Sequence, residues 1–420
     1  MKPKLLTILP TYTPALFRAD LIAGITVALV AIPLSIAIAI ASGASPEKGL
    51  LTAIVGGLII SVLGGSRVQI GGPTGAFIVV VYGVIATHGY DGLVLATLMA
   101  GAILLLAGLL RAGNLIAYVP EAVVNGFTIG IAIIIASSQL KDFLGLNVAS
   151  VPAEFLPKLA ALWDARASFN VHALGAGLVA LALIVLLRRM FPRLPGLIVA
   201  VSAVSALVVI FGLPVDNIDS RYGELPRSLP MPAVPKITLA RLTELLPSAL
   251  VIAFLAAIES LLSAVVADRL IEGRHRPNAE VLAQGWANIG SALFGGLPAT
   301  GAIARTATNV RAGGKTPVAG IIHALAILAI MMAAGPLAGY LSLPALAALL
   351  LTTAWNMSEP HKWRSYWSAP VSDRILLLLT LILTVLADLT IAIGVGVGIG
   401  LALRLRDSNQ KTTDWSDSDR

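Results

Sequence analysis

The sequence predicts an all-α polytopic membrane protein with fourteen transmembrane segments, built as two inverted seven-segment repeats. Of its 420 residues, 57% are hydrophobic and only 12% are charged, about half the charged fraction of a soluble domain. Residues 21–46 and 316–358 contain no charged side chain. Because a helix spans the hydrocarbon core with about 20 apolar residues, the second run must cross it at least twice. Short motifs that recur in both halves are the third observation and indicate the repeat.

Apolar runs between charges and Pro or Gly clusters give the candidate segments. In the first half they are residues 21–42, 50–63, 73–87, 92–110, 121–139, 171–190 and 195–212. In the second half they are residues 244–267, 279–294, 300–312, 317–334, 343–356, 372–387 and 389–404. The domain organisation follows as a first repeat over 1–212, an external linker over 213–243, a second repeat over 244–406 and a polar cytoplasmic tail over 407–420.

The basic residues predict the orientation of the chain. With the N-terminus in the cytoplasm, most of the 29 lysines and arginines fall on the cytoplasmic side, including Arg188 and Arg269. This asymmetry is typical of cytoplasmic loops. We therefore expect a multi-pass protein of the cell inner membrane with both termini in the cytoplasm, and the net charge of +7 requires no nucleic-acid partner.

Composition excludes other classes of protein and site. The first long apolar run is too long for a cleavable signal peptide. The chain has no cysteine, which excludes disulfides and thiolate metal sites. Its five histidines lack metal-ligand spacing and are interpreted as structural or interfacial. We expect no metal, no cofactor and no enzyme, because no His/Asp or Ser/His grouping is present.

The halves resemble each other where the second segment leads into the third. Residues 61–65 are similar to 291–296, and residues 73–77 are similar to 298–303. Seven is odd, so a second seven-segment copy enters the membrane from the opposite face. Inverted repeats with short, Gly- or Pro-interrupted segments at matching positions are typical of a binding site at the bilayer midplane.

The short third and tenth segments predict an anion site. A helix that begins inside the bilayer exposes free N–H groups and the positive end of its dipole. Two such starts, near Thr74-Gly75 and Thr300-Gly301, focus positive charge on one spot where an anion can bind. Residues 67–70, just before the first of them, are compatible with a short extended stretch. The alternative is that these glycines and threonines only permit tight helix packing.

Two ionisable residues lie near the predicted membrane centre. Arg305, one turn into the tenth segment, costs about 2.5–3.5 kcal/mol on insertion scales, so we expect it to face a cavity and add positive charge to the anion site. It could instead extend to the cytoplasmic interface. Glu259, in the middle of the eighth segment, is expected to be protonated or paired because desolvation disfavours its charged form. A proton carrier and a permanent partner of Arg305 are the two roles open to it.

Longer motifs resemble the SulP family of anion transporters over about residues 17–406. The most specific stretch is 278–315 with its continuation to Thr316, and further similarity lies at 20–27 and 118–127. The resemblance implies a mobile core domain (segments 1–4 and 8–11), a gate domain (segments 5–7 and 12–14) and half-helices at segments 3 and 10. It also implies alternating access by motion of the core against the gate.

The resemblance further implies an anion bound between the starts of helices 3 and 10, with contributions from helices 1 and 8. Helix 3 would contribute Thr74, Gly75, Ala76 and Phe77. Helix 10 would contribute Thr300, Gly301, Ala302, Ile303, Ala304 and Arg305. Helix 1 would contribute Leu34, Ser35 and Ile38, and helix 8 would bind the coupling ion through Glu259 and Ser263.

The chain departs from the family pattern in two respects. Family members usually continue into a cytoplasmic STAS domain, which is absent from this sequence. Many relatives have Pro-Gln in helix 1, where this chain has Pro33-Leu34-Ser35, so Ser35 is the candidate for the polar contact. Sodium-driven bicarbonate relatives use Asp near Glu259, which leaves H⁺ and Na⁺ open as coupling ions. The resemblance also implies a homodimer.

The favoured function is proton-coupled symport of a small anion, with a dicarboxylate such as fumarate preferred because Glu259 can carry a proton. The alternatives are sodium-coupled transport of bicarbonate or sulfate and an anion channel or exchanger. Nucleobase symport on the same architecture uses paired carboxylates on helices 8 and 10. Arg305 on helix 10 favours an anion over a nucleobase.

Overall fold

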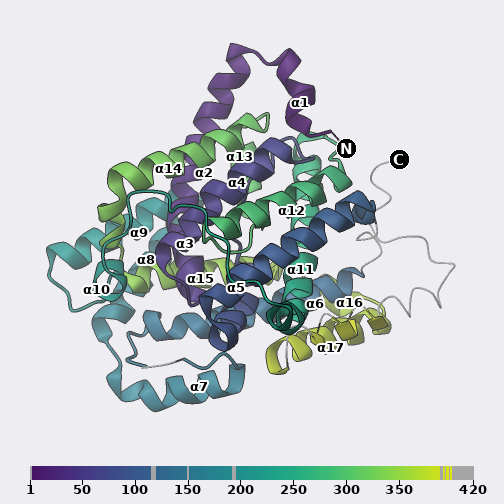
Figure 1. Ribbon diagram of the computed structural model, residues 1–420. Helices are drawn as coiled ribbons and strands as arrows, with labels where there is room; N and C mark the ends of the chain where they lie inside the picture. The colour runs from purple at the N-terminus through teal and green to yellow at the C-terminus, as the bar shows by residue number, and fades with distance from the viewer. Residues whose placement is uncertain are drawn as a thin grey trace.

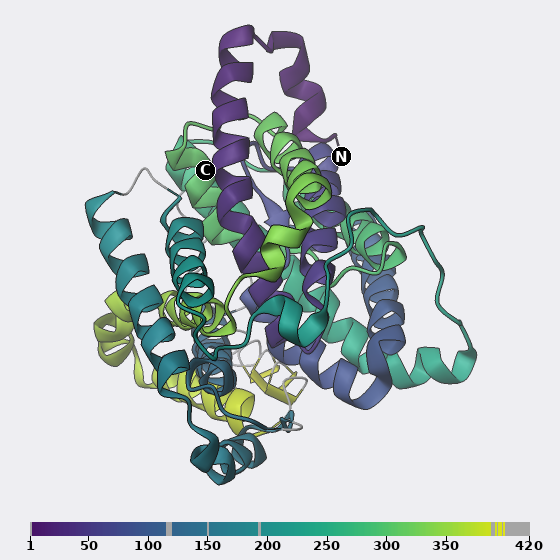
Figure 2. The same ribbon diagram turned by 90° about the vertical axis from the view of Figure 1, so that its left-hand side faces the viewer.

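The fold is a bundle of apolar helices (Figure 1), and the described residues also contain one short strand pair. The computed structural model describes residues 2–114, 120–148, 151–191, 195–387, 391–392, 394–396 and 398–399. In the described residues, α1 and the start of α2 project at one end as a hairpin, and α7 lies at the other end (Figures 1 and 2). The prediction of an all-α membrane fold is confirmed.

The elements follow one another along the chain. The first part contains α1 (Lys4–Ile8), η1 (Leu9–Thr11), α2 (Pro14–Ala41), α3 (Pro46–Leu51), η2 (Thr52–Gly56), α4 (Gly57–Leu63), β1 (Gly71–Gly72), η3 (Gly75–Phe77), α5 (Ile78–Leu109), α6 (Glu121–Phe143), α7 (Phe155–Asp164), η5 (Ala165–Ser168), α8 (Val171–Met190), α9 (Gly196–Ile210) and α10 (Ile218–Tyr222). The second part contains α11 (Leu239–Ile271), α12 (Pro277–Leu293), β2 (Thr300–Gly301), α13 (Ile303–Arg311), α14 (Val318–Gly339), α15 (Leu343–Met357), η6 (Pro360–Lys362), α16 (Trp363–Ser368) and α17 (Val371–Leu386).

Most predicted segments coincide with helices, and the differences have local causes. The predicted segment 171–190 coincides with α8, where the Asn170 side chain accepts hydrogen bonds from the first free N–H groups. The predicted segments 73–87 and 92–110 both lie in η3 and α5, and the chain turns between them at Gly89, whose φ is 69°. Helix α10 forms inside the predicted linker because Asn217 and Ser220 cap it reciprocally. The last predicted segment, 389–404, lies largely outside the described residues.

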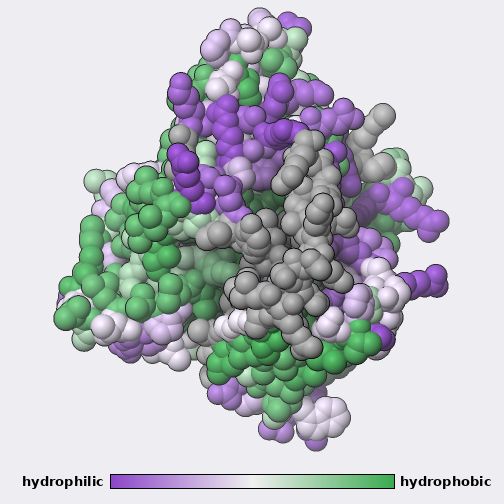
Figure 3. Space-filling model, turned by 90° about the vertical axis from the view of Figure 1, so that its right-hand side faces the viewer, coloured by the Kyte–Doolittle hydropathy of each residue, from purple (hydrophilic) through white to green (hydrophobic). Residues whose placement is uncertain are grey.

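Seven of the described helical spans are long and apolar enough to cross a membrane, and α9 is apolar but shorter. These spans are Pro14–Ala41, Pro46–Leu63, Gly75–Leu109, Glu121–Phe143, Val171–Met190, Leu239–Ile271 and Val318–Gly339. Outward-facing positions of α8 and α17 expose Leu178, Leu186 and Ile382, as expected for surfaces that contact lipid. Hydrophilic side chains gather below the projecting hairpin, and hydrophobic ones cover the flank beneath them (Figure 3).

The helices pack as two groups. In one group, α5 packs against α11 and α12, and α14 packs against α2 and α4. In the other, α6 packs against α15 and α17, and α8 packs against α9 and α15. The groups meet where α2 contacts α9 and α15 and where η3 contacts α6. This grouping agrees with the core and gate division that the family resemblance implies, whereas motion between the groups stays a prediction.

A buried lysine joins the two groups near α7. Lys158 of α7 is only 3% exposed, and its Nζ donates to Ser138 Oγ of α6 at 2.9 Å. The same Nζ lies 5.7 Å from the centre of the Tyr82 ring of α5, and the Tyr82 hydroxyl donates to the carbonyl of Val151. Burial lowers the pKa of Lys158 to about 8.

This pKa predicts a pH dependence of stability. Between about pH 8 and the ordinary lysine value of 10.5, the unfolded chain holds more protons than the folded one, so Lys158 makes stability rise with pH. In Lys158→Met we expect this rise to be smaller, and we expect stability at pH 7 to be retained. Melting curves of both proteins from pH 7 to 10.5 measure the difference. Parallel curves would contradict the assignment.

Candidate functional site

Two short strands cross at the middle of the first helix group. Strands β1 and β2 pair antiparallel, with Gly71 opposite Gly301 and Gly72 opposite Thr300. Each strand leads directly into a helix start: β1 into η3 and α5, and β2 into α13. The first N–H groups of a helix have no partner within the helix and carry the positive end of its dipole. The predicted pair of facing helix starts is therefore present.

Residues just before β1 are held by α13. The Ile70 carbonyl accepts from Ala302 N–H at 2.8 Å, and Ile70 N–H donates to Thr306 Oγ1 at 3.1 Å. Asn309 Nδ2 donates to the Val68 carbonyl at 2.8 Å. The strand β1 covers only residues 71 and 72, after the predicted stretch 67–70, because residues 67 and 68 form a bend.

Arg305 lies inside the protein against β1. Its side chain is 1% exposed, which is inconsistent with the alternative that it extends to the membrane interface. Nη2 donates at 2.9 Å to the Oγ of Ser35, in the last third of α2. A Cβ at Gly72, whose φ is 151°, would lie 2.2 Å from Arg305 Nη1, so the guanidinium rests directly on the glycine backbone.

Buried polar atoms without a partner are found in this guanidinium group and at the entry to η3. Arg305 Nε and Nη1 have no hydrogen-bond partner among the described residues, and neither does Thr74 Oγ1 at the entry to η3. Leaving a buried donor unsatisfied costs about 1–3 kcal/mol, and more when the group is charged. A site with free donors beside two helix starts is suited to an anion that accepts their hydrogen bonds.

The contact at Gly72 gives a prediction for the site. In Gly72→Ala the new methyl group would displace the guanidinium, and alanine disfavours this positive φ. We expect anion uptake to fall at least about tenfold, because a misplaced charged hydrogen bond loses about 1.5–3 kcal/mol. Concentration-dependent uptake measures this loss. Gly83→Ala is the control, since a Cβ at Gly83 meets nothing within 4 Å, and equal uptake by both variants would contradict the prediction.

The other residues predicted to bind the anion differ in their exposure and in their hydrogen-bond partners. Ala76, Phe77, Leu34 and Ile38 are buried in the apolar core. Ile303 and Ala304 are exposed at the start of α13. Thr300 Oγ1 donates to the Ala256 carbonyl of α11 at 3.0 Å, and a Cβ at Gly301 would lie 1.5 Å from Gln69 Nε2. Thr300 and Gly301 therefore hold the strand crossing in place, and their side-chain positions face α11 and Gln69.

The second helix group closes the site with apolar side chains. A Cβ at Gly75 would lie 3.0 Å from Met357 Sδ, 3.4 Å from Ile135 Cδ1 and 3.9 Å from Thr353 Cγ2. These residues belong to α6 and α15 and were not predicted as part of the site. No motif marks them, because single apolar residues in apolar helices look alike in a sequence.

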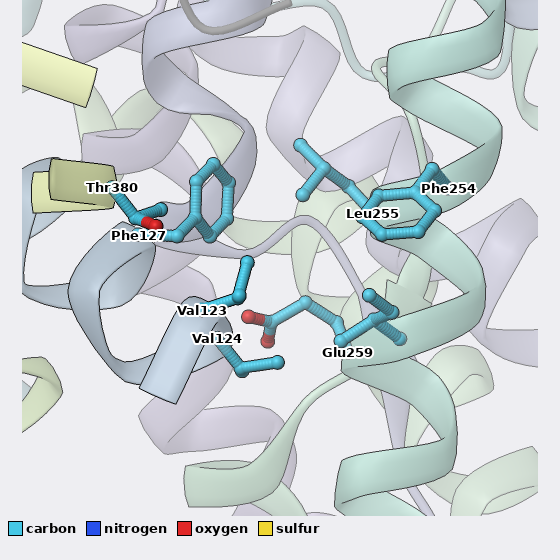
Figure 4. A pocket seen from close by; sticks show the side chains of 8 residues that line it. Val123, Val124, Phe127, Phe254, Leu255, Glu259 and Thr380 are labelled. Atoms are coloured by element: carbon cyan, nitrogen blue, oxygen red, sulfur yellow. The ribbon is translucent and has the colours of Figure 1, made fainter. Parts of the chain in front are cut away.

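Glu259 faces a different pocket from Arg305. It is half-buried on α11, and its carboxylate points toward Val123 and Val124 of α6 (Figure 4). The lining residues are Val123, Val124, Phe127, Phe254, Leu255, Ile258, Glu259 and Thr380. The structure shows no ion pair between Glu259 and Arg305 within the described residues, so the alternative of a permanent pair is wrong. The pairing fails because the two side chains leave α11 and α13 toward different helices.

The predicted partner of Glu259 lies on another face of α11. Ser263 is fully buried, and its Oγ lies 3.2 Å from Thr306 Oγ1 of α13. Glu259 instead points across the boundary between the two helix groups. A shared ion-coupling role for Glu259 and Ser263 stays a prediction, and the geometry favours Glu259 alone.

A buried carboxylate that the sequence analysis did not single out fixes the strand crossing. Glu280 of α12 is fully buried and accepts from Gly65 N–H at 2.8 Å and Ser66 N–H at 3.1 Å. It also accepts from Ser260 Oγ at 3.0 Å and Gln284 Nε2 at 2.8 Å. Glu280 and Gln284 both lie within the family-specific stretch 278–315. That resemblance was the signal in the sequence that could have pointed to them.

A second part of this polar network holds the approach to β2. Asn288 Nδ2 donates to the Ala299 carbonyl at 2.8 Å, and Ala299 N–H donates back to Asn288 Oδ1 at 3.0 Å. Gln69 Nε2 donates to Ser260 Oγ at 2.9 Å. These bonds tie both strands to α11 and α12, so the two helix starts have a fixed relative position.

Apolar spanning helices around facing half-helix starts and an unpaired buried guanidinium define a membrane transporter of anions. A search for family relationships agrees: the chain belongs to the sulfate permease family, whose model matches residues 17–380. This confirms the resemblance inferred from the motifs.

Curated relatives cover most of the chain. A putative sulfate transporter of Bacillus subtilis, YvdB, is 43% identical over 375 residues, which are 89% of this chain and 71% of the relative. The bicarbonate transporter BicA of Picosynechococcus is 30% identical over 383 residues, which are 89% of this chain and 67% of the relative. Both are named as transporters of small oxyanions.

Solved structures share the fold. The transmembrane domain of a cyanobacterial bicarbonate transporter BicA matches with a TM-score of 0.82 and 29% identity, over 91% of this chain and 99% of that domain. Murine Slc26a9 matches with a TM-score of 0.85 and 18% identity, over 96% of this chain and 70% of that protein. At this lower identity, the second match concerns the fold alone.

Proposed function

We propose that this protein is a secondary active transporter that carries a small oxyanion across the membrane together with protons. The observation that carries the proposal is the set of unpaired donors at the two helix starts: Arg305 Nε and Nη1 near the start of α13 and the Thr74 hydroxyl at the entry to η3. A guanidinium with two free nitrogens, helix N–H groups and a hydroxyl fit the oxygens of a planar or tetrahedral oxyanion. The third guanidinium nitrogen, Nη2, donates to Ser35 Oγ and is thereby held in place.

The substrate class is supported by the relatives. YvdB is named as a putative sulfate transporter and BicA as a bicarbonate transporter. Sulfate and bicarbonate therefore have stronger support than fumarate, the dicarboxylate favoured from the sequence. All three anions present oxygens that could accept from Arg305 and the helix N–H groups.

Proton coupling rests on the surroundings of Glu259. An ionised carboxylate among Val123, Val124, Phe127 and Ile258 is costly unless it is paired, and the described residues offer it no ion pair or hydrogen bond. Protonation removes that charge. Because Glu259 faces α6 across the boundary between the groups, its protonation state would influence how easily the first group slides past the second.

Transport itself would follow alternating access. The strand crossing, α11, α12 and α13 form one braced unit, and Gly75 at its centre packs against Ile135 and Met357 of the other group. Movement of the braced unit along this apolar wall would carry the anion with it. We place the protein in the cell inner membrane with both termini in the cytoplasm, as the basic residues predict.

The test is uptake into liposomes that contain the purified protein. Labelled sulfate, bicarbonate and fumarate are offered with and without an inward proton gradient, and separately with an inward sodium gradient. The proposal is supported if the proton gradient drives the accumulation of one of these anions above its equilibrium concentration. Uptake driven only by the sodium gradient would show that the coupling ion is sodium and not the proton. Flux that follows voltage alone would indicate a channel.

The prediction for Glu259 follows from the same assay. In Glu259→Gln the side chain stays neutral at every pH, so we expect anion exchange to persist while the proton gradient no longer drives accumulation. Glu244→Gln is the matched control, because Glu244 lies on the same helix with its side chain 59% exposed. Accumulation by Glu259→Gln that still follows the proton gradient would show that another group carries the proton.

A further inference from the structure

A histidine in α14 has properties that the proposed mechanism does not use. His323 is fully buried, and neither of its ring nitrogens has a hydrogen-bond partner among the described residues. Buried polar groups are nearly always hydrogen-bonded in proteins. The interpretation of all five histidines as structural or interfacial leaves these two unpaired nitrogens unexplained.

His323 and Arg305 both lie near β1. A Cβ at Gly57 of α4 would lie 3.9 Å from His323 Cε1 and 3.0 Å from the Gly71 carbonyl of β1. A Cβ at the next residue of β1, Gly72, would lie 2.2 Å from Arg305 Nη1. The imidazole and the guanidinium are therefore close to consecutive glycines of one strand.

Other charged groups around α14 already have partners or lie at the ends of neighbouring helices. Asp20 of α2 accepts from the backbone N–H groups of Lys315 and Thr316 before α14 begins. Glu280 is held beyond the end of α4 by Gly65 and Ser66. The charged residues of the other neighbouring elements are Arg18 near the start of α2, Glu47 and Lys48 at the start of α3, Asp219 and Arg221 in α10, and Arg311 at the end of α13. Of the charged side chains named here, Arg305 is the one that the contacts place against β1, the strand near His323.

We propose that His323 binds a proton from solvent when an anion occupies the site at Arg305. With the site empty, an imidazolium beside a buried, uncompensated guanidinium is strongly disfavoured, because like charges repel in a medium of low dielectric constant. A bound anion neutralises the guanidinium and attracts the imidazolium. Anion and proton then bind cooperatively, and each raises the affinity for the other. This inference rests on the proposed anion site.

The experiment separates His323 from Glu259. Sulfate is used as the probe because it does not titrate near neutral pH. Its dissociation constant is measured between pH 5.5 and 8 for Glu259→Gln and for the double variant Glu259→Gln/His323→Gln. One linked proton makes the dissociation constant rise by up to about tenfold per pH unit. We expect this slope in the single variant and a flat profile in the double variant.

Controls keep the test decisive. The control Glu259→Gln/His172→Gln replaces an exposed histidine on α8 and should keep the slope. A second variant, His323→Asn, repeats the replacement of His323 with a smaller amide. Proton uptake on adding sulfate to weakly buffered Glu259→Gln protein tests the proposal without any change at His323. Equal slopes with and without His323, or sulfate binding without proton uptake, would overturn it. Failure of the wild type to bind sulfate, bicarbonate or fumarate would instead overturn the proposed function.

Discussion

Replacing Arg305 with alanine is expected to lower anion uptake by about 100-fold or more. The substitution removes the only guanidinium at the helix starts, within the described residues, and with it the two free nitrogens, Nε and Nη1, that would donate to the proposed anion. Hydrogen bonds to charged groups contribute about 1.5–3 kcal/mol each, and 2.8 kcal/mol corresponds to about 100-fold in affinity. Initial rates of uptake over a range of anion concentrations measure the effect.

Two further variants serve as controls for Arg305→Ala. Arg311→Ala removes an exposed arginine from the end of the same helix and should leave uptake unchanged. Arg305→Lys keeps the charge without the planar fork of donors, so we expect an intermediate loss. Uptake by Arg305→Ala at the wild-type rate would show that the anion binds elsewhere.

Replacing Glu280 with alanine is expected to destabilise the protein more than any other single change proposed here. Four donors, including the N–H groups of Gly65 and Ser66, would lose their buried acceptor. Each unsatisfied donor costs about 1–3 kcal/mol, so a total loss of at least about 3 kcal/mol follows. The melting temperature of the detergent-solubilised protein, followed by its monodispersity on size-exclusion chromatography, measures this loss.

The controls for Glu280 separate its charge from its position. Glu280→Gln keeps an acceptor oxygen and should retain part of the stability. Glu272→Gln changes an exposed glutamate at the end of α11 and should have no effect. A melting temperature of Glu280→Ala equal to that of the wild type would mean that the strand crossing does not depend on this carboxylate.

Helices were predictable from the sequence because their signals are local. Runs of apolar residues, the glycines at 71–75 and the Thr300-Gly301 pair each lie within a few neighbouring positions. The burial of Arg305 was expected from the cost of a charge in the membrane. Short amphipathic helices such as α7 and α16 were missed, because their polar residues break the long apolar runs that define a spanning segment.

Contacts between distant parts of the chain could not be predicted in the same way. Glu280 and Gly65 are far apart in the sequence, and neither segment alone contains a pattern that predicts their hydrogen bond. Glu259 and Arg305 show the opposite case: both were expected near the membrane centre, but which way each side chain leaves its helix depends on helix rotation. The apolar wall of Ile135 and Met357 was unpredictable for a third reason, since its composition is that of any spanning helix.

That wall at Gly75 determines how much water an incoming ion can keep. Ile135 and Met357 approach the helix start closely and offer no oxygen or nitrogen to replace a lost water molecule. An anion that binds at the proposed site would therefore give up part of its hydration shell before it reaches Arg305, and this cost grows steeply with the charge of the ion. A singly charged anion enters with a smaller dehydration cost than a doubly charged one. The wall would thus favour anions by how weakly they hold water, independently of the hydrogen bonds that they form afterwards.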